Sequence, residues 1–460
     1  MAKRPTNIFG MPTSLRREPT PAEAILQEHA VVFRPLRGMG WGYWTTMTIL
    51  LAFILWGGYS YYLQVTQGLS VTGLNRPVFW GMYIVNFVFF IAISYGGTLT
   101  SAILRLAQAE WRRPITRLAE VITVCALLVG SFNVIMDMGR PDRLWELFVQ
   151  GRIQSPILWD VIAVNGYLLF SVIYLYLPMI PDIAFLRDHQ PGLLGWLYRY
   201  LALGWQGTPR QKHLLERIIG LMALFMIPLA ISVHTVLAWI FGMTIQPMWH
   251  STILGPYFVM GAIYSGLASL IIAMAILRRA LNLEKYLTLQ HFQNFGKILL
   301  AMTLVWLYFT IAEYLTTYYG SEPAHIAVFN AKLYGEFAPL FWGQVLFCLV
   351  IPLVILILPR LRTIPLLVVA SISINIGMWL ERVLIVVPTL TRPRLPYGVA
   401  TYTPTLTEWS IMIACAAWLV FFFMIFLRFF PIISIWEIEE EVEAEKEAAG
   451  VMPAAAPSAK

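Results

Sequence analysis

Residues 92–106 read AISYGGTLTSAILRL, and residues 262–280 read AIYSGLASLIIAMAILRRA. Both stretches lie in apolar runs long enough to cross a bilayer as an α-helix, which takes about 20 residues. A second pair, SPILWDV at 155–161 and APLFWGQV at 338–345, starts the run two helices further along in each half. These matches predict a parallel internal repeat of two four-helix bundles; chance similarity between apolar helices is the alternative.

The composition is that of a membrane protein. Of the 460 residues, 58% are hydrophobic and only 12% are charged, whereas soluble domains average about 45–50% and about 25%. The mean hydropathy of +0.69 agrees. The formal charge of +7 is therefore assigned to loops at the membrane surface rather than to a nucleic-acid site, and no nucleic-acid partner is expected.

The predicted fold is an all-α polytopic membrane protein with about ten transmembrane helices, in which two flanking helices enclose the two bundles. The chain divides into an N-terminal segment (1–43), a first transmembrane helix (44–66), a first four-helix bundle (78–242), a second four-helix bundle (252–388), a last transmembrane helix (407–430) and an acidic tail (431–460). The ten spans are predicted at 44–66, 78–104, 115–136, 157–178, 214–242, 252–277, 292–318, 337–358, 363–388 and 407–430.

The distribution of cations predicts the orientation. One side of these spans carries 21 Lys and Arg residues, and the opposite side carries 7. Lys and Arg accumulate in cytoplasmic loops, so both termini are predicted to be cytoplasmic, as in a multi-pass protein of a bacterial inner membrane. The terminal segments are either solvated extensions or docking arms for a partner subunit.

Metal chemistry within this chain is not expected. The three cysteines, Cys125, Cys348 and Cys415, lie in apolar runs and form no CxxC pair, which argues against a disulfide framework, an iron–sulfur cluster or a zinc site. A haem with two histidine ligands needs two deep histidines, and of the seven only His234 lies well inside a span. Electrons would therefore have to pass to a partner subunit.

Polar residues gather at the predicted outer end of the first bundle. Carboxylates, histidines, an arginine and aromatic rings near an interface suit an amphiphilic ring with two hydroxyls, because the polar groups bond its oxygens while the aromatics pack its faces. Asp and His can also take the protons released when a quinol is oxidised. The candidates are Asp137, Arg140, Ser155, Trp159, Asp160, His234, Trp249, His250 and Tyr257.

Each candidate also has a simpler interpretation. Asp137 could pair with Arg140 as a loop contact. Asp160 could interact favourably with the positive N-terminal end of the dipole of its own helix. His234 could be a buried histidine bonded to a neighbouring helix, and His250 could be an ordinary loop residue. Trp249 and Tyr257 could belong to an aromatic belt.

A second set of polar residues lies in the second bundle. Ionisable groups at membrane depth cost about 2.5–3.5 kcal/mol each on insertion scales, so they persist when they serve a pathway or are paired. These candidates either relay protons or join helices as polar contacts. They are Glu313, Gln344, Asn375, Glu381 and Arg382.

Several motifs resemble a known family. DMGRP at 137–141, SPILWD at 155–160 and SYGGTLTSAILR at 94–105 resemble the NrfD-type membrane subunits of polysulfide reductase. The flanking spans, the length and AEWRRPITRLAE at 109–120 look closer to the large membrane subunits of bacterial alternative complex III. That resemblance implies two four-helix bundles with an outer quinone site. It also implies a periplasmic iron–sulfur subunit, multihaem cytochrome c subunits and a paralogous membrane subunit as partners.

Carried over to this sequence, the resemblance implies a quinol pocket around Asp137, Arg140, Asp160 and His250, with His234 lining it. Asp160 and His250 would orient the quinol, with menaquinol as the expected substrate, and would take its protons. Relatives often have histidine where this chain has Asp137, and an aspartate has the lower normal pKa, about 3.9 against about 6.5. That difference leaves the acid–base role of Asp137 open.

The resulting hypothesis is a membrane subunit that oxidises quinol near the periplasmic face, passes electrons to a partner iron–sulfur subunit and helps to translocate protons. It would be an enzyme only as part of its complex. Three alternatives stay open: a secondary transporter, a structural anchor for peripheral electron carriers, and a proton-conducting paralogue without a quinol site of its own. The sequence leaves open the quinone, the final electron acceptor and the stoichiometry.

Overall fold

The computed structural model describes residues 28–189, 192–394 and 398–440. Within these ranges the regular structure is entirely helical, and ten helical segments are long and apolar enough to cross a membrane. The all-α prediction is therefore confirmed. The predicted N-terminal segment is described from residue 28 and the predicted tail up to residue 440, and the rest of both lies outside the described residues.

The observed spans lie close to the predicted ones, and the largest difference is in the fourth, which continues past a 3-10 turn to His189. The spans are formed by α3 (Trp41–Gln67), α4 (Met82–Leu106), α5 (Arg113–Asp137), α7 (Pro156–Tyr176) with α8 (Ile180–His189), α10 (Pro209–Gly242), α11 (Leu254–Ala280), α12 (Leu289–Gly320), α14 (Ala338–Val345) with α15 (Ile351–Ile357), α16 (Ile364–Thr391) and α17 (Leu406–Phe429). Shorter helices are α2 (Ala30–Arg37), α6 (Glu146–Val149), α9 (Leu193–Leu201) and α13 (Pro323–Leu333).

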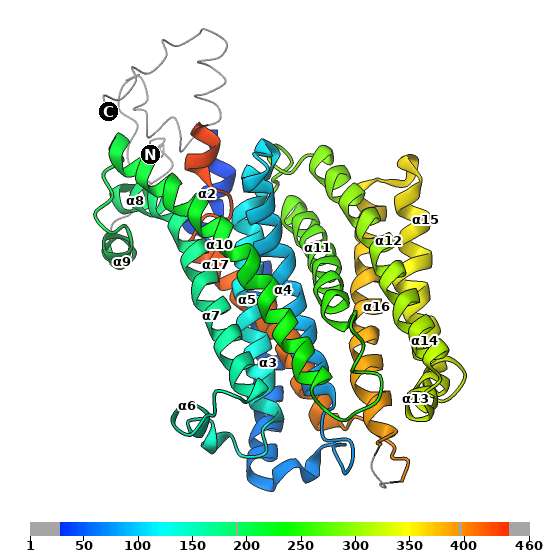
Figure 1. The fold of residues 1–460 in the computed structure, drawn as a ribbon. Coiled ribbons are helices and arrows are strands. Elements are labelled where there is room, and N and C mark those ends of the chain that lie inside the picture. The colour runs from blue at the N-terminus through cyan, green and yellow to red at the C-terminus, as the bar shows by residue number, and fades with distance from the viewer. Residues whose placement is uncertain (1–27, 190–191, 395–397, 441–460) are drawn as a thin grey trace, which may run out of the picture.

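The helices stand side by side and define two ends of the molecule (Figure 1). One end carries α2, α8 and α9 and is here named the α2 end; the other carries α6 and α13 and is named the α6 end. Helices α4, α5, α7 and α10 pack together as a first group, and α11, α12, α14–α15 and α16 pack as a second. Helices α3 and α17 pair with each other, and α17 also contacts α5.

Local sequence fixes where the long helices begin. Thr208 caps α10 by accepting a hydrogen bond from the N–H of Gln211, and Pro209 takes the first helical position, where its missing N–H costs nothing. Thr405 caps α17 in the same way through the N–H of Glu408. With 34 residues, α10 is about 51 Å long, and it crosses the first group obliquely (Figure 1).

The two groups meet at a crossing of glycines. Gly96 on α4 and Gly266 on α11 come from the two similar stretches of sequence, and their backbones touch. A Cβ built on Gly96 would lie 1.9 Å from the carbonyl carbon of Gly266. Without a hydrophobic driving force in lipid, close backbone packing of this kind is what associates helices. The two similar stretches thus supply a contact between the two helix groups.

We expect Gly96→Ala to destabilise the protein by about 3 kcal/mol, because the clash is with backbone that cannot move aside. The measurement is the thermal unfolding of the purified protein together with its folded yield. Gly166→Ala on α7 is the control, since a Cβ there meets nothing within 4 Å. Equal stability of the two variants would contradict the crossing.

Candidate functional site

Asp160 is placed near the α6 end by the start of α7. Ser155 is the N-cap residue in an extended conformation and Pro156 takes the first helical position, so Asp160 falls one turn inside. Its side chain is buried, and Oδ1 has no hydrogen-bond partner among the described residues. Leaving a buried polar atom unpaired costs about 1–3 kcal/mol, and more when the group is charged. The position therefore calls for a donor from a ligand or from water.

His234 is held on α10 by Tyr95 of α4. The Tyr95 hydroxyl donates to the carbonyl of Ala230 and accepts from the N–H of His234 at 3.0 Å, so it is inserted between two groups that a helix normally joins directly. The rings of Tyr95 and His234 are 4.0 Å apart. Both ring nitrogens of His234 are buried without a partner among the described residues.

Tyr95 connects these residues into one group, here named the Tyr95 cluster: Tyr95, Asp160, Tyr167 and His234. Asp160 lies two turns before Tyr167 on the same face of α7, and the Tyr167 ring lies 5.6 Å from that of Tyr95. The cluster places a carboxylate and an imidazole with unsatisfied atoms inside an apolar helix bundle. Such groups can accept and release protons, so the cluster is the candidate site.

Asp137 lies at the end of α5 and faces a different neighbour. The charged group that acts on it is Glu408 of α17, and both carboxylates act on the hydroxyl of Tyr83. That hydroxyl donates to Gln64 at 2.6 Å. The structure therefore places Asp137 against the α3–α17 pair, whereas Asp160 belongs to the Tyr95 cluster.

The other candidates from the α6 end lie nearer the surface. Arg140 is exposed and bonds both oxygens of Asp142, at 3.0 and 2.9 Å, rather than pairing with Asp137. Trp159 donates to the carbonyl of Ile153. His250 is exposed and stacks on His325, with ring centroids 6.1 Å apart. Ser155 makes no side-chain capping bond to α7.

The second helix group contains a small polar cavity of about 20 Å³, which is room for about one water molecule. Glu381 lines it and accepts from the indole of Trp306 at 2.7 Å and from Gln344 at 3.4 Å. Glu313 and Lys332 also line it. Two residues that the sequence assigned to the quinol pocket, Trp249 and Tyr257, line this cavity as well.

Arg382 connects the two groups. It donates to its neighbour Glu381 and lies over the ring of Phe258, 5.4 Å from the ring centre. Its charge also acts on His234 in the first group. Gly261 makes room for the guanidinium, since a Cβ there would lie 2.8 Å from Nη2. The Glu381–Arg382 pair therefore extends the polar site from one helix group to the other, while Asn375 lies elsewhere, bonded to Ser269 at 2.9 Å.

Lys332, on α13 outside the spans, gives this cavity a pH dependence. Burial lowers the pKa of Lys332 from 10.5 to about 8, although the carboxylates of Glu313 and Glu381 oppose the change. Between about pH 8 and pH 10.5 the unfolded chain therefore holds a proton that the folded chain has released. The free energy of unfolding then rises with pH through this window.

We expect the free energy of unfolding of Lys332→Met not to rise with pH in this window. The measurement is thermal unfolding of wild type and variant between about pH 8 and pH 10.5. The control is Lys285→Met, which removes an exposed lysine at the α2 end and should follow the wild-type curve. Parallel curves for wild type and Lys332→Met would contradict a buried, titrating Lys332.

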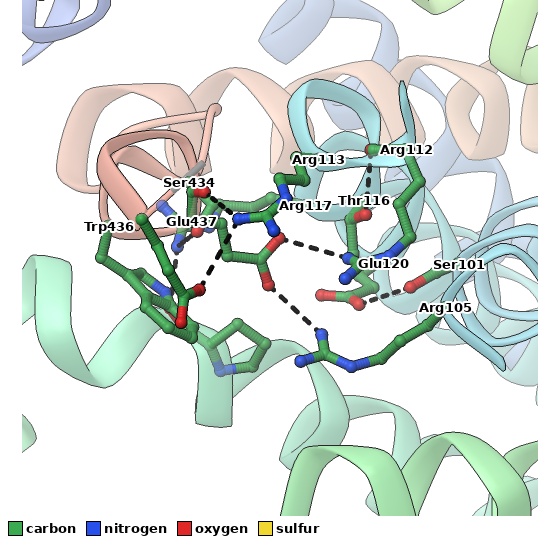
Figure 2. Close-up of polar contacts among 12 residues, drawn as sticks. Ser101, Arg105, Arg112, Arg113, Thr116, Arg117, Glu120, Ser434, Trp436 and Glu437 are labelled. Atoms are coloured by element: carbon green, nitrogen blue, oxygen red, sulfur yellow. Dashed lines mark hydrogen bonds and ion pairs between the residues drawn. The ribbon is translucent and has the colours of Figure 1, made fainter. Parts of the chain in front are cut away.

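The sequence analysis missed a polar stripe toward the α2 end of the first group. Ser101 donates to Glu120 at 2.8 Å and contacts the hydroxyl of Tyr174 at 3.2 Å, and Figure 2 shows the Ser101–Glu120 pair. Thr98 and Ser94, one and two turns before Ser101 on α4, lie beside the hydroxyl of Tyr167. The spacing of Ser94, Thr98 and Ser101 on one helix face was the available signal.

A buried ion cluster closes this stripe at the α2 end (Figure 2). Glu437, from the segment after α17, bonds Arg105 at 3.2 Å and Arg112 at 3.3 Å. Arg117 is 1% exposed and pairs with Asp182 at 2.6 Å. Arg117 also donates to the carbonyls of Pro431 and Ile433. These bonds and the Glu437 pairs dock residues 431–440 onto the first helix group, where the sequence analysis predicted a tail outside the membrane.

The fold and the buried polar groups define a polytopic membrane protein, and comparison with known proteins gives its family. The family described as Polysulphide reductase, NrfD matches residues 70–394, more than half of the chain. The chain therefore belongs to the NrfD family, as its motifs predicted. The resemblance to alternative complex III stays a prediction.

The similarity to several relatives extends along most of their length. The chain is 24% identical to a selenate reductase subunit of Mesobacillus selenatarsenatis, with 84% of this chain and 93% of that protein covered. It is 22% identical to the menaquinone reductase integral membrane subunit of Nitratidesulfovibrio vulgaris, covering 84% and 91%. It is 24% identical to the Hdr-like menaquinol oxidoreductase integral membrane subunit of Archaeoglobus fulgidus, covering 90% and 100%.

Proposed function

We propose that this chain is the quinol-oxidising membrane subunit of an oxidoreductase complex related to alternative complex III, with menaquinol as its substrate. The single observation that carries the proposal is the Tyr95 cluster. There, Asp160 and His234 keep buried polar atoms that find no partner among the described residues. Two relatives named for menaquinone or menaquinol are similar along most of the chain, which supports the choice of substrate.

In this proposal Asp160 accepts a hydrogen bond from a quinol hydroxyl and then takes its proton. His234 offers a second acceptor, and its position is fixed because Tyr95 holds the backbone of α10 at that point. Aromatic rings around the cluster pack the faces of the substrate ring. Arg140, Trp159, Ser155 and His250 lie nearer the surface of the α6 end, and their proposed part is in admitting and orienting the substrate.

The proposed orientation puts the α6 end in the periplasm and the α2 end in the cytoplasm of a bacterial inner membrane. The supporting observation is the distribution of Lys and Arg along the sequence, read by the positive-inside rule. Electrons then leave at the periplasmic face to an iron–sulfur subunit and on to multihaem cytochrome c subunits. The docked segment and the termini lie on the cytoplasmic side.

Protons have a proposed route through the first helix group. Glu120, Ser101 and Tyr174 lie at its α2 end, and Ser94, Thr98 and Tyr167 continue the line of hydroxyls to the Tyr95 cluster. The second group, with Glu313, Gln344, Glu381 and Arg382, is connected to the same cluster through Arg382. Both routes converge on His234, which makes it the proposed meeting point.

The first test is native purification in mild detergent, with identification of the associated subunits and analysis of extracted quinones. We expect the chain to co-purify with iron–sulfur and multihaem subunits, a paralogous membrane subunit and bound menaquinone. A chain that purifies alone without quinone, and that moves a solute after reconstitution, would overturn the proposal in favour of a transporter.

A further inference from the structure

A second cavity, unrelated to the Tyr95 cluster, opens between the α3–α17 pair and helix α11. Its volume is about 890 Å³, within the range of pockets that hold small molecules. Most of its wall is apolar, with Ile272, Ile276, Leu419 and Phe423 among the lining side chains. Ile276 and Val420 are exposed, so the cavity opens sideways toward the bilayer.

The cavity has the depth of one leaflet. Along α11 its lining runs from Ser269, near the middle of that helix, to Leu281 just past its end. That stretch is about 18 Å long, and half of a hydrocarbon core about 30 Å thick is about 15 Å. A hydrocarbon chain that enters from the α2 end would fill the cavity to its floor.

The mouth at the α2 end is suited to an anion. Arg34 lines it, is exposed, and forms no hydrogen bond or ion pair with any other described residue. Arg428 holds α2 in place over the mouth by donating to the carbonyls of Pro35 at 3.0 Å and Leu36 at 2.6 Å. The 27-residue helix α3 begins beside it after Gly40 without a side-chain cap, and a helix N-terminus favours negative charge.

The floor offers few groups for a polar headgroup. Ser269 already bonds Asn375 at 2.9 Å, and Asn375 donates to the carbonyl of Ser371 at 3.0 Å. A quinone ring at the floor would find one remaining N–H of Asn375 as a donor and otherwise apolar side chains. A transmembrane helix of a partner would have to run the full thickness of the bilayer, whereas this cavity ends halfway.

We propose that this cavity binds an anionic phospholipid of the leaflet at the α2 end. The acyl chains lie along α11 and α17, and the phosphate lies at the mouth with Arg34 and the start of α3. Basic pockets between transmembrane helices bind acidic lipid headgroups by the same chemistry. The site is separate from the proposed quinol site, so either proposal can fail without the other.

The test is photolabelling of the purified complex in nanodiscs of phosphatidylcholine. One sample contains phosphatidylglycerol with a diazirine in its acyl chain, and a second contains phosphatidylcholine with the same diazirine. Labelled residues are mapped by mass spectrometry. We expect labels at the α11 and α17 lining, several-fold stronger for phosphatidylglycerol.

Two variants make the test specific. Arg34→Gln lies on the surface and cannot disturb the core; it is expected to weaken the phosphatidylglycerol label about fivefold, the effect of one cation near an anionic headgroup. Ala273→Trp fills the cavity and should remove the label. The matched controls are Arg199→Gln, an exposed arginine of α9 at the same end, and Leu224→Trp, an exposed position of α10, and both should label as wild type.

Three results would overturn the proposal. The first is equal labelling by the two lipids, with no change in the Arg34→Gln variant. The second is labelling of the same residues by a diazirine analogue of menaquinone that phosphatidylglycerol does not displace. The third is protection by the complex: if the lining residues are labelled in the isolated chain but not in the complex, a helix of a partner occupies the cavity.

Discussion

Asp160→Asn is expected to lower quinol oxidation by about 100-fold or more, the usual contribution of a positioned acid–base group. Asparagine keeps the size and the polarity of the side chain, but it cannot take a proton. Asp160 lies in the Tyr95 cluster with an unpaired oxygen. Its proposed contribution is therefore to catalysis and not to the stability of the fold. The loss should therefore fall on kcat, while KM changes little.

The measurement is steady-state oxidation of a menaquinol analogue by the purified complex, alongside its melting temperature and the set of subunits it retains. Glu146→Gln is the matched control, since it removes a partly exposed carboxylate at the same end of the molecule and should keep full activity. An assembled Asp160→Asn complex with wild-type kcat would remove Asp160 from the mechanism. Full activity together with loss of bound menaquinone would also contradict its role.

Arg117→Met is expected to lower the free energy of unfolding by about 3–5 kcal/mol, because it leaves a buried carboxylate without its cation. Arg117 bonds Asp182 and also donates to the carbonyls of Pro178 at 2.9 Å and of Pro431 and Ile433 at 3.1 Å each. Its loss should also loosen the start of the segment at Pro431–Ser434, while Arg105, Arg112 and Arg113 still bind Glu437. Denaturation and limited proteolysis of this segment measure the two effects.

A double variant separates charge from shape. Asp182 also accepts from the N–H groups of Ile435 and Trp436, so Arg117→Met with Asp182→Asn, which removes the charge but keeps an acceptor, should regain part of the lost stability. Arg140→Met is the control, because Arg140 and Asp142 form an exposed pair and such pairs add little. If Arg117→Met and Arg140→Met unfold alike, the buried cluster does not stabilise the fold.

The number and position of the spans could be predicted because lipid leaves a chain few options. Each crossing needs about 20 apolar residues with its backbone bonded internally, so the hydropathy of the sequence shows every span directly. The importance of Gly96 and Gly266 could also be predicted, because they lie in the two similar stretches. What the sequence could not show was that these glycines touch each other.

The site was only partly predictable, because helix rotation and loop paths decide which polar groups meet. Asp160 and His234 were expected in one place. Tyr95 contacts the rings of His234 and of Tyr167, which shares α7 with Asp160, and their common role stays a prediction. Asn375 and Glu381 were grouped by chemistry, yet six residues rotate a helix by about 240°, so they face different neighbours. His250 is placed by a loop whose path no periodicity predicts, and it contacts His325.

The docking of residues 431–440 on Arg117 also means that the fold around Arg117 is completed only at the end of synthesis. Arg117 and Asp182 enter the membrane region early, whereas their partners Pro431, Ile433 and Ser434 follow more than 240 residues after Asp182. Until the last helix has been made, the guanidinium lacks three of its acceptors. A ribosome that stops before α17 therefore leaves a product with an exposed polar defect, which cellular quality control can recognise and remove.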